Sequence, residues 1–250
     1  MSAAGDRVAQ AIVADIADAR VRPGDPLPGA PELARRFAVG AGAVAGALRD
    51  LEARGMVAAQ PDGRVTVRPE AQWDVLDEDV LTALLASQHG PRVLAEYLEY
   101  RRVVEVIAAG LAAEHATTED LTALSNSLAE MTEAAENAPA SVEAEARFHR
   151  ADVDFHQALI AAGRNRPLEL ATDALRPALC TARQMLARPH LREERALPEH
   201  RRILAAVAQG DADAARAAMA THLATVESYL REYAGLSGCA PESSGRPDEP

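Results

Sequence analysis

The sequence predicts a mainly α protein in two parts: three short helices and a β-hairpin, followed by an all-α bundle of six or seven helices. The 250-residue chain is 48% hydrophobic but only 3% aromatic, so its core must be built from Ala, Leu and Val. Ala and Leu are strong helix formers, and small side chains allow helices to pack closely. Apolar residues recur at helical spacing along most of the chain, whereas β-like runs occur at residues 56–69.

Short breaks separate the first three predicted helices. Apolar residues at helical spacing predict the first helix over residues 4–20, and the segment RPGDPLPG ends it. A second helix runs from Pro31, which suits a first helical turn, to Phe37. A third helix ends near Arg54, where Gly55 can adopt the positive φ that often terminates a helix.

A hairpin completes the N-terminal domain. The segment MVAAQPDGRVTVRP places two short β-like runs on either side of a Pro-Asp-Gly turn. Three helices followed by a two-stranded ribbon is the element order of a winged helix-turn-helix. We therefore assign residues 1–69 to such a domain and residues 70–76 to a linker that docks through Trp73.

Beyond the linker, the sequence contains only helical patterns. Breaks at Gly, Pro and Thr-Thr positions separate the helices, and Asp211 after Gly210 is a good N-cap. The all-α domain is predicted to span residues 77–234, and the polar residues 235–250 are predicted to form a disordered tail. The predicted helices of this domain span residues 77–88, 92–115, 118–136, 141–162, 166–187, 191–209 and 211–233.

Charge is distributed unevenly along the chain. Residues 1–70 contain nine Arg and nine acidic residues, whereas residues 71–250 contain 17 Arg and 29 acidic residues and so carry the whole net charge of −12. Only the N-terminal part can therefore approach a phosphate backbone without strong repulsion. Two Cys residues do not form a disulfide framework, and no apolar run is long enough to span a membrane. We expect a soluble, cytoplasmic protein that does not bind membranes.

Three His and one Asp are candidate metal ligands in the bundle. Asp152 and His156 are four residues apart, so they lie on the same face of one helix. His200 and His222 each lie in a separate predicted helix, next to residues with core-like spacing. Such groups on the inward faces of separate helices suit a divalent metal held in a bundle core. The alternative for any one His is an ordinary core or surface residue.

Two sets of motifs match one known family. In the first domain they are RPGDPLPG, ELARRFAV, ALRDLEARGMV and TVRP, and in the second EYRRVVEVIAAGLAAEHATTEDL, DVDFHQALIAAGRN and PEHRRILAAVAQGDADAARAAMATHL. Over about residues 4–233 the chain resembles the FadR subfamily of the GntR family of bacterial regulators. The resemblance implies a regulator that binds double-stranded operator DNA and a small carboxylate effector. We expect a homodimer, because reading two half-sites requires two recognition helices.

The resemblance also implies a metal site. Metal-binding members of this subfamily hold a divalent ion with one Asp and three His, which here match Asp152, His156, His200 and His222. This donor set suits Zn²⁺, the leading candidate, and also Ni²⁺ or Mn²⁺. His149 lies one helical turn before Asp152 and could compete as a ligand, but it matches no family position.

Three further residues are candidates for contacting the effector. Arg101 matches an Arg that points into the family's cavity, and a guanidinium can hold a carboxylate through two hydrogen bonds. The alternative is a surface ion pair with Glu105, which would be worth roughly 0.3–0.5 kcal/mol. Glu105 is itself a candidate contact. Asn165 follows the Phe-His helix, where a cap in the αL conformation is preferred to an effector contact.

The segment WDVLDEDVLTALLAS is similar to the branch that responds to sugar acids such as galactonate or gluconate.

The DNA-binding face departs from the family pattern. Pro31, Ala41 and Ala45 replace three Arg residues of typical members, and Val65 replaces the second Gly of the wing. Because one Arg–guanine contact discriminates by roughly 1–3 kcal/mol, these losses weaken operator binding. The apolar framework survives. The Arg residues left to contact DNA, or else to form a solvated face paired with nearby acids, are Arg35, Arg36, Arg49, Arg54, Arg64 and Arg68.

Together these features predict a metal-dependent, metabolite-responsive transcriptional repressor and not an enzyme. One alternative is a sensor that has lost operator binding and acts through another protein. A second alternative is a helical-bundle metalloenzyme, for which Glu105 is the only candidate general base.

Overall fold

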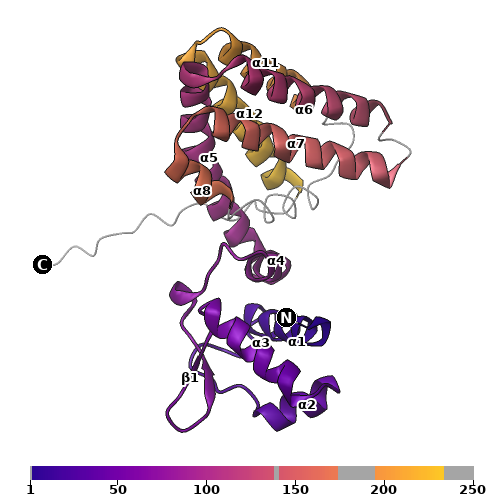
Figure 1. Ribbon diagram of the computed structural model, residues 1–250, viewed down its shortest axis with the longest axis vertical. Coiled ribbons are helices and arrows are strands. Elements are labelled where there is room, and N and C mark those ends of the chain that lie inside the picture. Colours follow the sequence, from indigo (N-terminus) through magenta and orange to yellow (C-terminus); the bar gives the residue numbers. More distant parts are fainter. Residues whose placement is uncertain (1, 138–140, 174–194, 234–250) are drawn as a thin grey trace, which may run out of the picture.

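The computed structural model describes residues 2–137, 141–173 and 195–233, which form an elongated molecule with a domain at each end (Figure 1). A small domain of three helices and a hairpin lies at one end, and a helical bundle lies at the other. α4 (Glu78–Ala86) and the long α5 (Gly90–His115) connect them. The predicted fold class, a winged helix-turn-helix followed by an all-α domain, is confirmed.

Three helices form the core of the N-terminal domain. They are α1 (Ala3–Ala17), α2 (Ala30–Phe37) and α3 (Ala41–Ala53), and their ends lie within three residues of the predicted ones. α1 packs across α3, and the apolar side chains of Ile12 and Leu51 are fully buried. The helical spacing of apolar residues thus correctly indicated which face of each helix is inward.

The predicted hairpin is also present. β1 (Val57–Ala59) and β2 (Val65–Val67) pair antiparallel, and Gly63 in the turn between them has a φ of +83°. Gly55 ends α3 with a φ of +69°, as predicted. A Cβ atom at Gly55 would lie 2.1 Å from the backbone oxygen of Gln72, so both the conformation and the close approach require glycine.

The linker docks onto the N-terminal domain through Trp73, as predicted. After the short 3₁₀ helix η1 (Glu70–Gln72), the indole of Trp73 joins the apolar cluster of that domain, and its Nε1–H donates to the carbonyl of Arg68 at 2.9 Å. α4 continues this packing, because Val80 and Leu84 belong to the same cluster and α4 contacts α1. The first helix after the linker therefore shares its core with the N-terminal domain.

One Arg ties α3 to α4. The guanidinium of Arg54, just after α3, lies 3.3 Å from Asp77 and 2.8 Å from Asp79 at the start of α4. It also lies 3.1 Å from Asp50 of α3. The amide of Gln10, from α1, donates to Asp79 as well. These contacts fix the first turn of α4 against α3 and α1.

The bundle is built from α5 and the helices that follow it. α6 (Thr118–Asn137) and α7 (Val142–Ala162) pack along each other, as do α5 and α12 (Ala212–Tyr233) (Figure 1). Side-chain hydrogen bonds cap the N-termini of several of these helices. Ser141 caps α7, Asp211 caps α12 as predicted, and Thr117 exchanges hydrogen bonds with Asp120 at the start of α6. The other helices of the described part of the bundle are α8 (Arg166–Asp173) and α11 (Leu197–Ala208).

Some predictions concern residues that the structure does not describe. The predicted helices over residues 166–187 and 191–209 are described only as α8 and α11. Residues 174–194, which include Cys180, and the predicted tail 235–250, which includes Cys239, lie outside the described residues. Among the described helices, none is long and apolar enough to cross a membrane.

Replacing Arg54 should destabilise the protein, because three carboxylates would then lie close together without their cation. The Arg54 side chain is only 16% exposed, so we expect Arg54→Met to lower the free energy of unfolding by about 2 kcal/mol, between the values for exposed and fully buried ion pairs. Urea unfolding measures this change. Arg64→Met is the matched control, since Arg64 is 67% exposed and pairs with Asp62 inside the hairpin. Equal stability of the two variants would contradict the tie between α3 and α4.

Candidate metal centre and DNA-binding face

Three helices bring the predicted metal ligands together. Asp152 and His156 lie one turn apart on α7, His200 lies on α11, and His222 lies on α12. Each offers one ligand atom, and these atoms all lie within 4.8 Å of one another. All four side chains are buried; His200 is wholly inaccessible to solvent. The convergence expected from the sequence is therefore present in the structure.

The distances between the ligand atoms are those of a compact cluster. Nε2 of His200 lies 3.0 Å from Oδ1 of Asp152 and 3.3 Å from Nε2 of His156, and the latter lies 3.8 Å from the same Asp152 oxygen. Ligand atoms placed tetrahedrally around Zn²⁺ at its usual bond lengths lie about 3.4 Å apart. The donor set thus has the chemistry that suits a divalent ion, and the ligand atoms of Asp152, His156 and His200 lie close to the spacing of ligands around one ion.

Nδ1 of each of the three imidazoles lies within 3.0 Å of an oxygen atom. Nδ1 of His156 lies 2.6 Å from Oε2 of Glu105, Nδ1 of His200 lies 2.7 Å from the carbonyl of Ala196, and Nδ1 of His222 lies 3.0 Å from Oε2 of Glu199. An Nδ1–H that donates to such an oxygen leaves the lone pair of Nε2 free for a metal.

Two of these acceptors were not found by the sequence analysis. An acidic residue in the first turn of a helix is ordinarily explained by a favourable interaction with the helix dipole. The position of Glu199 in the first turn of α11 therefore did not indicate a contact with His222. The carbonyl of Ala196 has no side-chain signature at all. Glu105 was singled out, but as an effector contact and not as a partner of His156.

Arg101 and Glu105 form a buried ion pair on α5. Nε and one terminal nitrogen of Arg101 lie 2.6 Å and 3.1 Å from the two carboxylate oxygens of Glu105. Both side chains are only 4% exposed, so the alternative of a solvent-exposed pair on the helix surface is wrong. Burial by itself raises the pKa of Glu105, but Arg101 and His156 together hold that pKa well below its ordinary value. Glu105 is therefore ionised, and Arg101 already has a carboxylate partner.

Burial shifts the pKa of His222 and the pKa of its neighbour Glu199 in opposite directions. It holds the pKa of His222 well below its usual value, and the neighbouring His200 lowers that pKa further. His222 is therefore neutral near pH 7, as a metal ligand must be. Burial raises the pKa of Glu199, and the hydrogen bond donated by Thr225 acts in the opposite direction.

The prediction for the conformation of Asn165 is wrong. The residue in the left-handed region is Arg164, whose φ is +53°, and Asn165 instead accepts a hydrogen bond from the backbone N–H of Leu168 at 3.2 Å. Asn165 thus caps the start of α8, because its short side chain can reach back to that N–H. It is exposed and lies nine residues beyond His156, so an effector contact by Asn165 remains a prediction.

His149 does not join the cluster. It is buried on α7, and its Nε2 lies 4.0 Å from Glu145, one turn earlier on the same helix. The four residues within ligand distance of one another do not include it.

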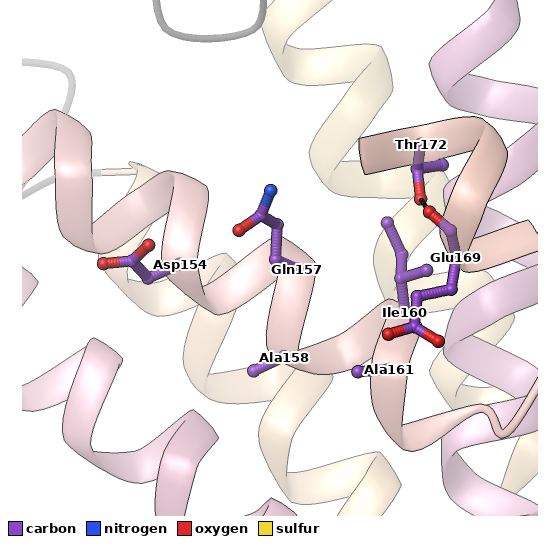
Figure 2. A pocket seen from close by; sticks show the side chains of 7 residues that line it. All are labelled: Asp154, Gln157, Ala158, Ile160, Ala161, Glu169 and Thr172. Atoms are coloured by element: carbon purple, nitrogen blue, oxygen red, sulfur yellow. Dashed lines mark hydrogen bonds between the residues drawn. The ribbon is translucent and has the colours of Figure 1, made fainter. Parts of the chain in front are cut away.

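A separate pocket of about 310 Å³ lies between α7 and α8 (Figure 2). Its lining includes neither Arg101 nor any of the four clustered residues, so it is distinct from the candidate metal centre. Figure 2 shows side chains along one side of α7, together with two residues from α8. The lining residues are Asp154, Gln157, Ala158, Ile160, Ala161, Glu169 and Thr172.

Most Arg residues proposed to contact DNA already have partners within the chain. Arg36 lies 2.7 Å from Asp15 of α1, Arg64 pairs with Asp62 at 2.7 Å, and Nε of Arg68 donates to Gln72. Nε of Arg49 donates to the carbonyl of Ala45 on its own helix. Arg35 is exposed on α2, and no ion pair involving it is found among the described residues.

The Arg positions of the family that are replaced in this chain are exposed in the structure. Pro31 lies in the first turn of α2, and Ala41 and Ala45 lie on α3; all three are exposed. Gly29, which precedes α2, provides no side-chain cap. The helices nevertheless form, because their buried apolar faces are intact.

Comparison with protein families accounts for both parts of the chain. Residues 4–67 match the family described as bacterial regulatory proteins, gntR family, and residues 96–225 match the FCD domain. The chain belongs to the GntR family. Its FCD domain contains the four clustered residues together with Arg101 and Glu105.

Curated relatives match over most of their length. The galactonate operon transcriptional repressor of Escherichia coli K12 is 29% identical over 231 residues, covering 91% of this chain and 96% of the relative. LutR, an HTH-type transcriptional regulator of Bacillus subtilis, is 33% identical over 224 residues, covering 87% and 97%. NanR, an HTH-type transcriptional repressor of Klebsiella aerogenes, is 32% identical over 217 residues, covering 83% and 78%. The family and these relatives are transcriptional regulators and not enzymes, so the metalloenzyme alternative loses support.

Solved structures share the fold. A protein described as Lar, which controls expression of the Listeria monocytogenes agr system, superposes with a TM-score of 0.64 at 16% identity, covering 93% of this chain and 99% of that one. Streptococcus agalactiae GntR superposes with a TM-score of 0.50 at 21% identity, covering 90% and 99%. At these identities the similarity concerns the fold alone.

Arg101→Met should be strongly destabilising, because it leaves the charge of Glu105 buried without its cation. We expect a loss of about 3–5 kcal/mol in the free energy of unfolding, measured by urea denaturation of chelator-treated protein. The adjacent Arg102→Met is the control, since Arg102 is 56% exposed and lies 3.8 Å from Glu227. Adding Glu105→Met to Arg101→Met should restore much of the loss. Similar stabilities for Arg101→Met and Arg102→Met would contradict a buried pair.

Proposed function

We propose that this protein is a dimeric transcriptional repressor whose FCD domain holds a divalent metal and a small carboxylate effector. The observation that carries the proposal is the buried convergence of Asp152, His156, His200 and His222 in a chain that also has a winged helix-turn-helix. In this proposal residues 1–69 bind DNA, residues 70–76 link the domains, and residues 77–234 sense the metabolite. Such a regulator acts in the bacterial cytoplasm, where its DNA is.

The donor set supports Zn²⁺ as the ion, with Ni²⁺ or Mn²⁺ as alternatives. Three imidazoles and one carboxylate suit each of these metals, and affinity order alone does not choose among them. When bound, the ion would supply a Lewis-acidic position for a carboxylate group of the effector. Arg101, buried nearby on α5, would bind the same effector if it exchanged its bond with Glu105 for one with the ligand.

A sugar acid is the effector class that we propose. The segment at residues 73–87 is similar to the sugar-acid-responsive branch of the subfamily, and one relative over almost the whole chain is named for the galactonate operon. Such a ligand combines a carboxylate, which suits Arg101 and a metal, with hydroxyl groups.

The contacts between elements support a route from the effector site to the DNA-binding domain. α5 carries Arg101 and Glu105 and is preceded by α4, which packs on α1 and binds Arg54 through Asp77 and Asp79. An effector that binds one arrangement of these helices more tightly shifts the population toward that arrangement. In the dimer this would change the relative setting of the two recognition helices.

One observation favours a second candidate function. Three Arg positions of the family's DNA-binding face are Pro31, Ala41 and Ala45, and most remaining Arg residues are paired within the chain. The second candidate is therefore an effector sensor that no longer reads an operator and acts through another protein.

A mobility-shift experiment separates these two functions. With DNA from upstream of its own gene, we expect the protein to prefer that sequence over an unrelated fragment at low salt, and to lose affinity steeply as salt rises. Ala45→Arg restores a family Arg on the exposed face of α3 and should tighten binding and steepen the salt dependence by about one phosphate contact. Absence of any sequence preference at low salt would reject operator binding and favour the sensor.

Metal binding is tested separately with chelator-treated protein. Added Zn²⁺ should raise the melting temperature of the wild type, since a ligand at 100 times its Kd stabilises the folded state by about 2.7 kcal/mol. His200→Ala should lose this stabilisation and its bound Zn²⁺, measured by elemental analysis. His149→Ala is the matched control, because His149 is a buried His on α7 outside the cluster. Equal zinc content in the wild type and a His156→Ala/His200→Ala variant would reject the site.

A further inference from the structure

Glu199 is a buried carboxylate whose two oxygens are both in use. It lies in the first turn of α11, next to His200, and is only 7% exposed. Oε1 accepts a hydrogen bond from the hydroxyl of Thr225 at 2.7 Å, and Oε2 lies 3.0 Å from Nδ1 of His222. Thr225 and His222 both belong to α12, so this one side chain from α11 reaches across to two residues of the neighbouring helix.

This position is difficult to explain by the dipole of α11. An acidic residue in a first helical turn can interact favourably with the helix dipole while it stays in solvent, without losing its hydration. A buried carboxylate loses that hydration, so it needs hydrogen bonds within the protein in its place. The carboxylate of Glu199 instead lies 3.0 Å from Nδ1 of His222, a residue of the ligand cluster, which leaves Nε2 as the ring nitrogen available to an ion. No ion pair between Glu199 and an Arg is found in the described part of the chain.

We propose that Glu199 is a positioning residue of the metal centre, which holds the proton of His222 on Nδ1 and so presents Nε2 to the ion. This inference rests on the metal-binding function proposed above. Thr225 in turn fixes the second oxygen of Glu199. The carboxylate also balances the positive charge that His222 gains when its Nε2 binds a cation, so it should strengthen binding as well as orient the ring.

The other two imidazoles also have an oxygen within 2.7 Å of Nδ1, but Glu199 is the most informative of the three groups that supply these oxygens. Glu105 faces His156 but is also bonded to Arg101, so replacing Glu105 disturbs a buried ion pair. The acceptor for His200 is a backbone carbonyl and cannot be removed by substitution. Glu199 contacts His222 and Thr225, which makes its variants the cleanest test.

The test measures Zn²⁺ affinity of the full-length, metal-free protein by competition with a chromophoric chelator. Glu199→Ala should raise the Kd for Zn²⁺ by 10- to 100-fold, the range found when a partner of a metal-bound His is removed. Glu199→Gln keeps an oxygen acceptor but loses the charge, so it should restore part of the affinity. Thr225→Val should raise the Kd in the same direction, but less. Glu114→Gln, on the surface of α5, is the control and should bind as the wild type does.

A second measurement does not need the metal. In metal-free protein, imidazole ¹⁵N spectra should show His222 as the neutral tautomer protonated at Nδ1, and in Glu199→Ala the proton should shift toward Nε2. A merely structural contact between α11 and α12 would change the melting temperature but not this tautomer. Circular dichroism checks that each variant folds. If Glu199→Ala does not fold, the Kd and the tautomer are measured on Glu199→Gln, because the Gln side chain has nearly the same shape as that of Glu.

The outcomes distinguish this inference from the proposed function. A wild-type protein that binds no Zn²⁺ through His200 would reject the proposed function, whereas the tautomer of His222 would still report whether Glu199 positions the ring. Variants at Glu199 that keep both the wild-type Kd and the wild-type tautomer would overturn the role of Glu199.

Discussion

The structure depends on one constraint: polar groups buried in an apolar, alanine-rich bundle must be satisfied by one another. Three imidazoles lie in the interior, and Nδ1 of each lies within 3.0 Å of an oxygen, from Glu105, from the carbonyl of Ala196 or from Glu199. Nε2 of His156 and Nε2 of His200 lie 3.0–3.8 Å from each other and from Oδ1 of Asp152. The ligand atoms of all four residues lie within 4.8 Å of one another. Lone pairs that face one another at such distances repel, and a cation among them removes that repulsion. The orientation of the rings and the suitability for a metal therefore have the same cause.

The same constraint links the bundle to the N-terminal domain. Glu105 is shared between Arg101 and His156, so the charge on α5 and the orientation of a metal-ligand candidate on α7 are not independent. α5 follows directly on α4, whose apolar face is part of the N-terminal core and whose first turn is bonded to Arg54. Contiguous contacts therefore join α5, which carries the buried pair, to the recognition helix α3.

Much of the fold followed from local patterns, and the exceptions have physical reasons. The spacing of residues such as Ile12 and Leu51 reports which side of a helix is buried, and Gly55 reports a backbone conformation that other residues avoid. Asn165 was assigned to the wrong conformation, because the left-handed position and the cap of the next helix are adjacent residues in a tight turn. Glu199 was missed because its partner His222 lies 23 residues away and no short-range pattern joins them.

The sequence alone determined the order and approximate ends of the helices, the hairpin, the family, and the four residue types suited to one metal ion. These properties depend on periodicity, turn residues and motif spacing, which are encoded locally. Only the tertiary structure decided that the ligand atoms meet, that Arg101 and Glu105 are buried rather than exposed, and that most Arg residues of the DNA-binding face are already paired. Those facts depend on distances between helices remote in the chain, and such distances are set by packing rather than by any local pattern.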